Sequence, residues 1–532
     1  MATFREIATP DQDQTDMPAD PAVLRVFFSI IALALVVAVP YLIPGLEAYR
    51  PWVVGDKHPF YGMFSTTGAG PLVAEASGGV EAGEAVGGKE AAVLAQLGDL
   101  DNEAPVEDLP LPDVEPVPEA GDAPTAPLDG GPDAGQAAPV AKPLFAGIKV
   151  PPEAYKDVEV KIEDPNGAMK HFYDQLHGSA QRKPGAITRV AHWGDSAIAA
   201  DGITSSTRTH LQRLFGDSGH GFILAASSSS WYSHKGVRYG SKGWKTMNII
   251  HRAAKDKHYG FGGVRAHGFP GVFSRFATAD SGPVGRKVSR FDIYYLAGPR
   301  QGDLALTVDK GEPVYVPTAS DTLEDRVHSV EVPDGEHELR IQAKGGQLNV
   351  YGVAMERDRP GVVYDGLGIV GFIEDRHHNA DFAHFKKQLE LRDPNLMILM
   401  YGGNKLGFPK LGMARYEEDF EKVIKLFRKA RPTASCLVMS PLDHGERHRG
   451  GIRTVPRLHD MVAVQRRVAL RNGCAWYSAF EAMGGEGSMG RWANSKPALG
   501  WKDYAHVTKH GAQVMGTLFY QALMAGYVDH TK

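Results

Sequence analysis

Short hydrophobic runs alternate with amphipathic segments over most of the chain. The run at 394–403, "PNLMILMYGG", is almost continuously apolar, which favours a strand of a parallel sheet that is covered on both faces. A second buried strand is predicted at 186–193, and a third at 435–440 follows the amphipathic helix of 416–432. This alternation predicts an α/β domain in three layers, with helices on both faces of the sheet.

The rhythm changes between residues 264 and 356, where short strands are separated by turns, as in "RFDIYYLAG" and "DLALTVD". This spacing is typical of a β-sandwich. The sequence therefore predicts an all-β module at 264–356, inserted into an α/β domain made of 146–263 and 357–532. The Ser-, Gly- and Trp-rich stretch just before the module, 227–250, fits either an ordered active-site wall or a long surface loop.

Residues 26–43, "VFFSIIALALVVAVPYLI", carry no charge and would span roughly 27 Å as a helix. We expect a transmembrane anchor at 23–46, after an N-terminal tail at 1–22. A cleaved signal peptide is the alternative. However, the segment before this run is long and most of its charged residues are acidic, whereas a signal peptide begins with a short basic segment. Between Ser65 and Leu144 there is no aromatic residue, so the Pro-, Gly-, Ala- and acid-rich segment 47–145 is predicted to be a disordered linker.

The formal net charge is only -5 and no basic patch is interleaved with aromatic residues, which argues against a nucleic-acid partner. The chain has 2 cysteines, too few for a disulfide framework. Cys436 and Cys474 both lie in apolar runs typical of adjacent buried strands, so buried thiols are the default expectation, and the sequence leaves open whether the two pair.

The tripeptide Gly-Asp-Ser occurs twice, ending at Ser196 and at Ser218. Ser196 directly follows a buried strand and precedes a helical pattern, which would place its hydroxyl at the carboxyl edge of the sheet, where open α/β folds bind ligands. Ser218 instead follows a helix end in a glycine-rich turn, which fits a helix C-cap. Ser196 is therefore the candidate nucleophile, although Gly, Asp and Ser are also common turn residues.

Asp503 and His506 lie three residues apart, immediately before the last predicted helix. At this spacing a carboxylate can bind one nitrogen of an imidazole while the other nitrogen faces a nucleophile. The competing explanation is a helix-capping aspartate beside an unrelated surface histidine. Two further segments suit an acyl-transfer site, because Asn404 can donate its amide to an oxyanion and Gly371, chosen over Gly368, can donate its backbone N–H.

Together these segments resemble the four sequence blocks of the SGNH hydrolases, also called GDSL esterases. In chain order the blocks are Gly194-Asp195-Ser196, the glycine of "LGIVGF", Gly402-Gly403-Asn404, and Asp503-Tyr504-Ala505-His506. The resemblance covers residues 186 to 526 apart from the inserted module. It implies a flavodoxin-like α/β/α fold and a triad that needs no metal or cofactor, with Ser196 as nucleophile, His506 as base and Asp503 as its orienting group. The implied oxyanion hole consists of the N–H groups of Ser196 and Gly371 and the amide of Asn404.

Two positions depart from the family pattern, since Lys405 follows the asparagine where an acidic residue is common and Val370 replaces a frequent polar residue. The inserted sandwich and the hydrophobic N-terminal segment are similar to those of bacterial peptidoglycan O-acetylesterases. That resemblance implies a membrane-anchored, extracytoplasmic esterase acting on an O-acetylated polysaccharide, with peptidoglycan as the expected substrate. The same triad would also serve an O-acetyltransferase, and a non-catalytic glycan-binding protein is a third alternative.

The histidine-rich segments give a weaker signal. His444 and His448 have the spacing of helical metal ligands, but the glycines around them favour a loop, so we expect exposed or substrate-lining histidines and no metal. Trp231, Trp244 and Trp492 fit either sugar-stacking or core positions equally well.

Overall fold

The computed structural model describes residues 147–408 and 410–532. The predicted tail, anchor and linker lie outside these residues, and so does the hydrophobic run at 26–43. Within the described part of the chain, no helix combines the length and apolar character needed to cross a bilayer.

Five parallel strands form the central sheet, in the order β13-β1-β14-β15-β18. Numbered by their appearance in the chain, they follow the order 2-1-3-4-5, which is that of flavodoxin-like folds. The bounds are β1 Ile187–Gly194, β13 Gly361–Gly368, β14 Leu396–Met400, β15 Ser435–Met439 and β18 Ala475–Tyr477. The strands predicted at 186–193, 394–403 and 435–440 are confirmed as β1, β14 and β15.

Helices cover both faces of this sheet, and β14 shows why. Leu396, Ile398 and Met400 pack into one hydrophobic cluster, whereas Met397 and Leu399 pack into another on the opposite face. The first cluster is closed by α4 (Lys170–Ala180), α6 (Gly202–Phe215) and α12 (Lys509–His530), and the second by α7 (Phe382–Arg392), α8 (Met413–Ala430) and α9 (Arg457–Arg471). The predicted three-layer arrangement is therefore present.

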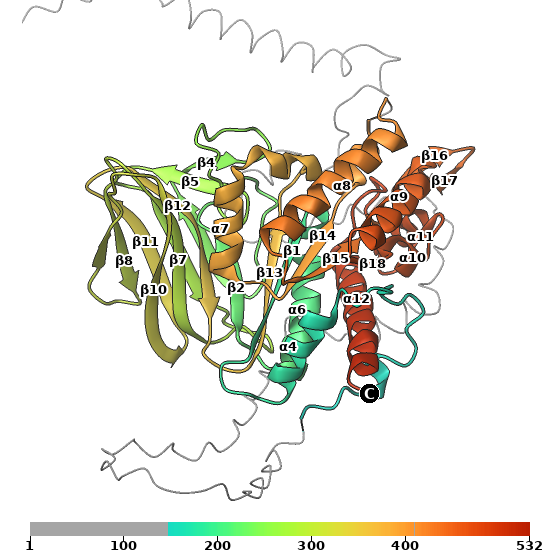
Figure 1. Ribbon diagram of the computed structural model, residues 1–532, viewed down its shortest axis with the longest axis horizontal. Coiled ribbons are helices and arrows are strands. Elements are labelled where there is room, and N and C mark those ends of the chain that lie inside the picture. The colour runs from blue at the N-terminus through green and yellow to red at the C-terminus, as the bar shows by residue number, and fades with distance from the viewer. Residues whose placement is uncertain (1–146, 409) are drawn as a thin grey trace, which may run out of the picture. The chain divides into compact units, whose positions relative to one another are not determined.

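A sandwich of two antiparallel sheets lies beside this domain, at the left of Figure 1. One sheet has the order β10-β7-β12-β5-β4, with β2 also paired to β12, and the other has the order β3-β6-β11-β8-β9. Phe291 and Ile293 from the first sheet meet Leu339 and Ile341 from the second in a shared core. The strands are β2 Gly219–Leu224, β3 Val237–Lys242, β4 Lys245–Asn248, β5 Val264–Gly268, β6 Phe273–Thr278, β7 Val288–Ala297, β8 Asp303–Val308, β9 Val314–Pro317, β10 Glu324–Gly335, β11 Glu338–Lys344 and β12 Leu348–Glu356.

The sandwich is larger than the predicted segment 264–356, because β2, β3 and β4 precede residue 264 and pair into its sheets. The strands β3 and β4 are sheet edges with mostly polar side chains, which is why their sequence resembles a loop. The stretch 227–250 thus combines a loop with two edge strands.

The two cysteines form a disulfide, Cys436–Cys474, and are not the buried thiols expected from the sequence. Cys436 lies in β15 and Cys474 immediately precedes β18, its neighbour in the sheet, so their Cα atoms are only 4.6 Å apart.

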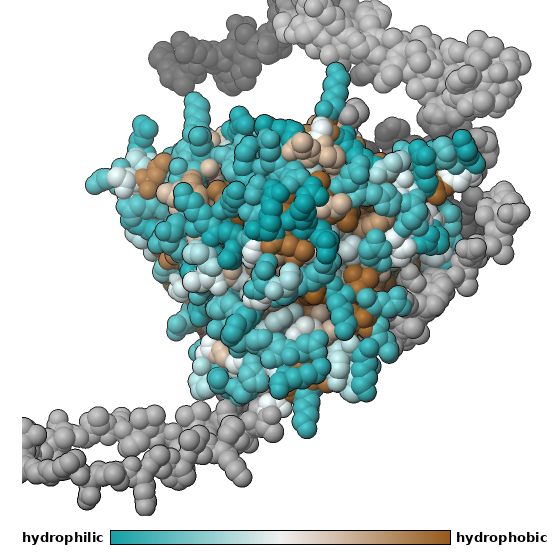
Figure 2. Space-filling model, turned by 45° about the vertical axis from the view of Figure 1, so that its right-hand side comes forward, coloured by the Kyte–Doolittle hydropathy of each residue, from teal (hydrophilic) through white to brown (hydrophobic). Residues whose placement is uncertain are grey.

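On the face shown in Figure 2, hydrophilic side chains dominate and hydrophobic ones form small separate patches.

Candidate active site

Ser196 lies at the carboxyl end of β1, as the first residue of the short helix α5 (Ser196–Ala199). Asp195 caps this helix, since its carboxylate accepts the Ala197 N–H at 3.0 Å. Gly194 makes the sharp turn possible, because a Cβ there would lie 2.4 Å from the Ile198 side chain. The strand, the glycine and the cap together project the Ser196 hydroxyl at the edge of the sheet.

The second Gly-Asp-Ser has a different environment. Ser218 is fully buried, and its hydroxyl donates to the carbonyl of Arg359 at 2.6 Å. This serine serves the packing of the domain, in keeping with its interpretation as a turn residue.

His506 and Asp503 belong to the loop that precedes α12, and Asp503 organises this loop. Its Oδ1 accepts the N–H groups of Ala505 at 3.0 Å and of His506 at 3.1 Å. Tyr504 between them has a left-handed backbone, with φ of 57°, and its carbonyl accepts the N–H of Gly445 at 2.7 Å. A non-glycine residue in this conformation is costly, and such strain is common at functional sites.

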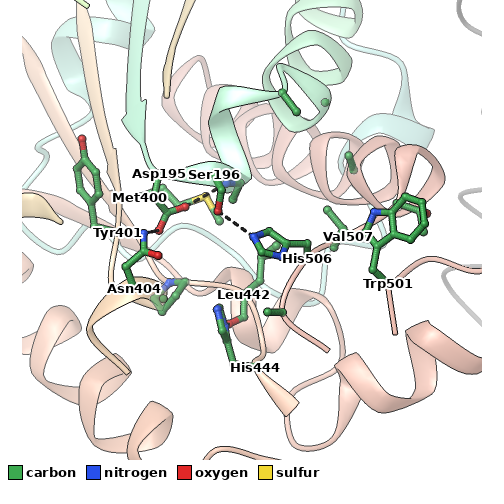
Figure 3. A pocket seen from close by; sticks show the side chains of 18 of the residues that line it. Asp195, Ser196, Met400, Tyr401, Asn404, Leu442, His444, Trp501, His506 and Val507 are labelled. Atoms are coloured by element: carbon green, nitrogen blue, oxygen red, sulfur yellow. Dashed lines mark hydrogen bonds between the residues drawn. The ribbon is translucent and has the colours of Figure 1, made fainter. Parts of the chain in front are cut away.

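Ser196, His506 and Asp503 form one hydrogen-bonded chain, of which Figure 3 shows the contact between Ser196 and His506. The Ser196 Oγ lies 3.0 Å from His506 Nε2, and His506 Nδ1 lies 2.7 Å from Asp503 Oδ2. Burial alone would raise the pKa of Asp503, but the hydrogen bonds from the Ala505 N–H and from His506 outweigh it and hold the pKa below its usual value. An ionised Asp503 accepts a hydrogen bond from the Nδ1–H of His506, which leaves Nε2 as the acceptor facing the serine hydroxyl.

A cavity of about 550 Å³ opens next to this chain of residues. The side chains of His506 and Asp503 are 50% and 51% exposed, so a polymer can reach the serine without passing through a tunnel. Among the residues that line the cavity are Ser196, Asn404, His444, Trp501 and His506.

Asn404 follows β14 and projects into this cavity from the short 3-10 helix Gly403–Lys405. Its Nδ2 donates to the carbonyl of Phe372 at 3.0 Å and, over a longer 3.4 Å, to Asp195 Oδ2. Burial raises the pKa of Asp195 to about 6. The contact to Asp195 is the longer and weaker of these two hydrogen bonds of the Asn404 amide.

Gly371 lies in an exposed turn after β13, with φ of 76°, and is outside the set of residues that line the cavity. The next residue, Phe372, accepts the Asn404 amide, which connects this turn to the cavity wall. Lys405, the departure from the family pattern, is buried and pairs with Glu374 at 2.9 Å, so it joins the same two segments.

Two further residues line the cavity, and the sequence indicated a possible role for only one of them, His444. His444 was expected to be exposed or substrate-lining, and it does line the cavity, whereas His448 lies exposed on the β16 strand (Gly445–His448). The Nδ1 of His444 donates to the Leu442 carbonyl at 3.0 Å and burial lowers its pKa, so the ring is neutral and its Nε2 is an acceptor. Trp501 was missed, and the signal available was its position five residues before His506.

The three tryptophans considered from the sequence differ in environment. Trp231 is 72% exposed, Trp492 is buried, and Trp244 is partly buried with its indole N–H donating to the Phe273 carbonyl at 2.9 Å. Only Trp231 of these three is placed as a sugar-stacking residue would be.

One group of side chains, His258, Asp325 and His384, has the spacing of metal ligands. However, His384 Nδ1 lies 2.7 Å from Asp325, and His384 Nε2 accepts two backbone N–H groups, those of Tyr259 and Gly260. Both ring nitrogens of His384 therefore already have hydrogen-bond partners. Because Asp325 belongs to β10 and His384 to α7, this cluster joins the sandwich to the α/β domain.

No family model matches the chain, and no curated protein sequence matches it. Among solved structures, a peptidoglycan O-acetylesterase is 22% identical and has a TM-score of 0.59, covering 69% of this chain and 99% of that chain. Family-two carbohydrate esterases from Myceliophthora fergusii and Cellvibrio japonicus are 10% and 12% identical, with TM-scores of 0.26 and 0.22. They cover 54% and 56% of this chain, and 100% and 99% of their own.

The likeness to the first of these structures extends over nearly all of that protein and includes most of the described residues. This chain therefore shares the fold of that peptidoglycan O-acetylesterase, and its central sheet has the flavodoxin-like strand order that the resemblance of its four sequence blocks implied.

Proposed function

We propose that this protein is a serine esterase that removes O-acetyl groups from a polysaccharide of the cell wall. The observation that carries this proposal is the geometry of Ser196, His506 and Asp503, which is the geometry of a serine-histidine-aspartate triad. The SGNH-type esterase fold supports it, because the serine occupies the strand end at which such folds place a nucleophile.

In the first step, His506 Nε2 takes the proton of Ser196 as the hydroxyl oxygen attacks the acetyl carbonyl. Asp503 holds the Nδ1–H and stabilises the imidazolium that forms. The negative charge that develops on the carbonyl oxygen is stabilised by the N–H of Ser196 and the amide of Asn404. The N–H of Gly371 remains the predicted third donor.

The tetrahedral intermediate collapses when His506 returns its proton to the sugar oxygen, which leaves with an intact hydroxyl group. A water molecule, deprotonated by His506, then attacks the acetyl-serine through a second oxyanion. Acetate is released and the Ser196 hydroxyl is restored. Every proton in this cycle passes through one nitrogen, His506 Nε2.

The substrate that we propose is O-acetylated peptidoglycan, because the similar structure reported above is that of a peptidoglycan O-acetylesterase. The exposure of the triad supports a polymeric substrate. We also propose that the hydrophobic run at 26–43 anchors the enzyme in a membrane with its catalytic domain outside the cytoplasm, where cell-wall glycans are found.

The test is acetate release by the full chain from O-acetylated peptidoglycan, acetylxylan and an aryl acetate. The Ser196→Ala variant is expected to lose turnover on all three. The chain supplies its own matched control, since Ser218→Ala changes the serine of the second Gly-Asp-Ser and should retain turnover. Full activity in a folded Ser196→Ala variant would refute the triad.

The same experiment separates hydrolysis from transfer. If acetylated glycan accumulates in place of acetate when an acceptor sugar is added, the enzyme is an O-acetyltransferase with the same triad. Binding to glycan strands with no turnover on any ester would indicate a non-catalytic glycan-binding protein.

A further inference from the structure

A buried ion pair joins the segment of Asn404 to the segment of Gly371, the two predicted oxyanion donors besides Ser196. Lys405 directly follows Asn404, and its Nζ lies 2.9 Å from Oε1 of Glu374. Both side chains of the pair are almost completely buried, with 6% and 1% of their surface exposed. Glu374 follows Gly371 by three residues, so each end of the pair lies close in the chain to one donor.

Stability alone is a poor explanation for this pair. Removing two charges from water has a large cost, which their attraction repays only in part, so a buried ion pair often stabilises a fold no more than two apolar side chains of the same size. The cost is visible at Glu374, because burial raises its pKa even though Lys405 lies beside it. An ion pair does, however, hold its two segments at a defined separation, which apolar contacts do less strictly.

The 3-10 helix Gly403–Lys405 that contains Asn404 is too short to determine its own orientation. Because such a helix has three residues per turn, the side chains of neighbouring residues project about 120° apart around its axis. Asn404 lines the cavity (Figure 3), whereas Lys405 is buried and its Nζ also lies 5.3 Å from the centre of the Tyr416 ring. A rotation of this helix would move both side chains together, so a contact that fixes Lys405 also fixes the direction of Asn404.

The segment that binds Lys405 also binds Asn404 directly. Asn404 Nδ2 donates to the carbonyl of Phe372 at 3.0 Å, and Glu374 is two residues further along the chain. This segment is itself well packed, because Phe372 is buried and its ring contacts those of His377 and Tyr401. Asn404 is thus held from one buried segment by two contacts, its own hydrogen bond and the ion pair of its neighbour.

We propose that Lys405 and Glu374 are positioning residues, which hold the amide of Asn404 in the direction that the oxyanion requires. This inference rests on the proposed function and adds to it the means by which the oxyanion hole is kept in place. It also gives a reason for Lys405, at which the chain departs from the family pattern. Since a donor stabilises the transition state only when it is aimed at the developing charge, a small rotation of the short helix should slow the chemical step and leave substrate binding nearly unchanged.

The test replaces the pair, in the full chain, by apolar side chains of similar size. Lys405→Met alone would leave a buried carboxylate without its partner and destabilise the fold, so the variant to use is Lys405→Met/Glu374→Leu. Its kcat on an aryl acetate should fall about tenfold, which is part of the roughly hundredfold loss expected when the donor itself is removed. KM should stay within about twofold of the wild type, and the midpoint of urea unfolding should change little.

Combination with Asn404→Ala separates positioning from a structural role. If the pair acts through Asn404, the same replacement should have almost no further effect on kcat once that amide is absent, because effects that share one cause do not add. The matched control is Lys386→Met/Glu390→Leu, which makes the same two substitutions in an exposed ion pair of α7. This control should leave kcat and urea unfolding unchanged.

The inference would be overturned if the pair variant kept the kcat of the wild type, or if its loss of kcat recurred in full in the Asn404→Ala background. A loss of folded protein would also overturn it, because the pair would then serve stability. The proposed function is tested separately, since turnover by Ser196→Ala would defeat it whatever the pair does. An inactive Ser196→Ala together with a normal kcat in the pair variant would defeat only the positioning role.

Discussion

Asn404 offers the sharpest quantitative test of the site, because the proposed mechanism gives its amide a second role, in the transition state, besides its hydrogen bonds in the resting structure. In the resting structure its Nδ2 donates to Phe372 at 3.0 Å and to Asp195 at 3.4 Å. In the reaction the proton of the longer contact is expected to turn to the substrate oxyanion. The Asn404→Ala variant removes both interactions, and their effects are measured by different experiments.

The catalytic effect should be much larger than the structural one. Removing one oxyanion donor from an acyl-transfer site typically costs about 3 kcal/mol of transition-state stabilisation, which corresponds to a hundredfold or greater loss of kcat. A neutral hydrogen bond contributes about 1 kcal/mol to stability, and the long contact to Asp195 contributes less. Asn404→Ala should therefore lower kcat at least about a hundredfold while the free energy of unfolding falls by only about 1 to 2 kcal/mol.

Steady-state kinetics on an aryl acetate gives kcat and KM, and urea unfolding gives the stability of the same preparation. KM should change little, because the donor acts on charge that develops only in the transition state. A kcat within threefold of wild type would show that Asn404 is not an oxyanion donor. A loss of kcat accompanied by a loss of folded protein would assign Asn404 to structure instead.

Three further predictions concern other residues. The pKa of Asp195 is raised by burial from its ordinary 3.8 to about 6. Between these two values the folded chain keeps a proton that the unfolded chain has lost, so the free energy of unfolding falls as pH rises through this window. The Asp195→Asn variant should lack this pH dependence. The difference in the free energy of unfolding between the wild type and Asp195→Asn, measured by urea unfolding, should change by about 3 kcal/mol from pH 3.5 to 7. A difference that stays constant with pH would refute the argument from burial. The Cys436→Ala/Cys474→Ala variant should lose about 4 kcal/mol of stability, which is the chain-entropy value for a separation of 38 residues. If a reducing agent does not change the unfolding of the wild type, this prediction is wrong. His444→Ala should raise KM for peptidoglycan about fivefold, the value of one hydrogen bond to a substrate hydroxyl, and a large loss of kcat would place His444 in the chemistry instead.

The central domain could be predicted from sequence because its strands are buried on both faces. A run such as Leu396–Met400 contains no alternation of polar and apolar residues, so it is not confused with a surface strand. The ends of such strands are clear in the sequence, and Ser196 and Asn404 lie just past two of them. Ser196 and Asn404 could be predicted for the same reason, since parallel strands bring their carboxyl ends to a common edge. His506 and Asp503 precede the helix α12, and they were predicted from their spacing and from the resemblance to the four sequence blocks.

The beginning of the sandwich could not be predicted, because edge strands are defined by their partners and not by their own side chains. The strand β4, Lys245–Asn248, carries one hydrophobic residue, and only its pairing with β5 makes it a strand. The disulfide was missed for a related reason. The sequence placed Cys436 and Cys474 in adjacent strands, but bond formation depends on register, which periodicity alone does not determine.

The topology of the sheet explains how a large insertion can contribute to the site without disrupting it. The insertion lies between β1 and β13, and β13 is the edge strand, so no central strand is displaced. The segment of β2 also covers this edge, where the Phe222 N–H donates to Asp365 of β13 at 2.7 Å. Because β1 ends where α5 begins at Ser196, a loop that leaves the sandwich near this edge reaches this short helix, as the contact of Ser233 with Ala199 shows. The sandwich loop can then change while Ser196, at the end of β1, and the loop before α12 that contains His506 and Asp503 stay fixed.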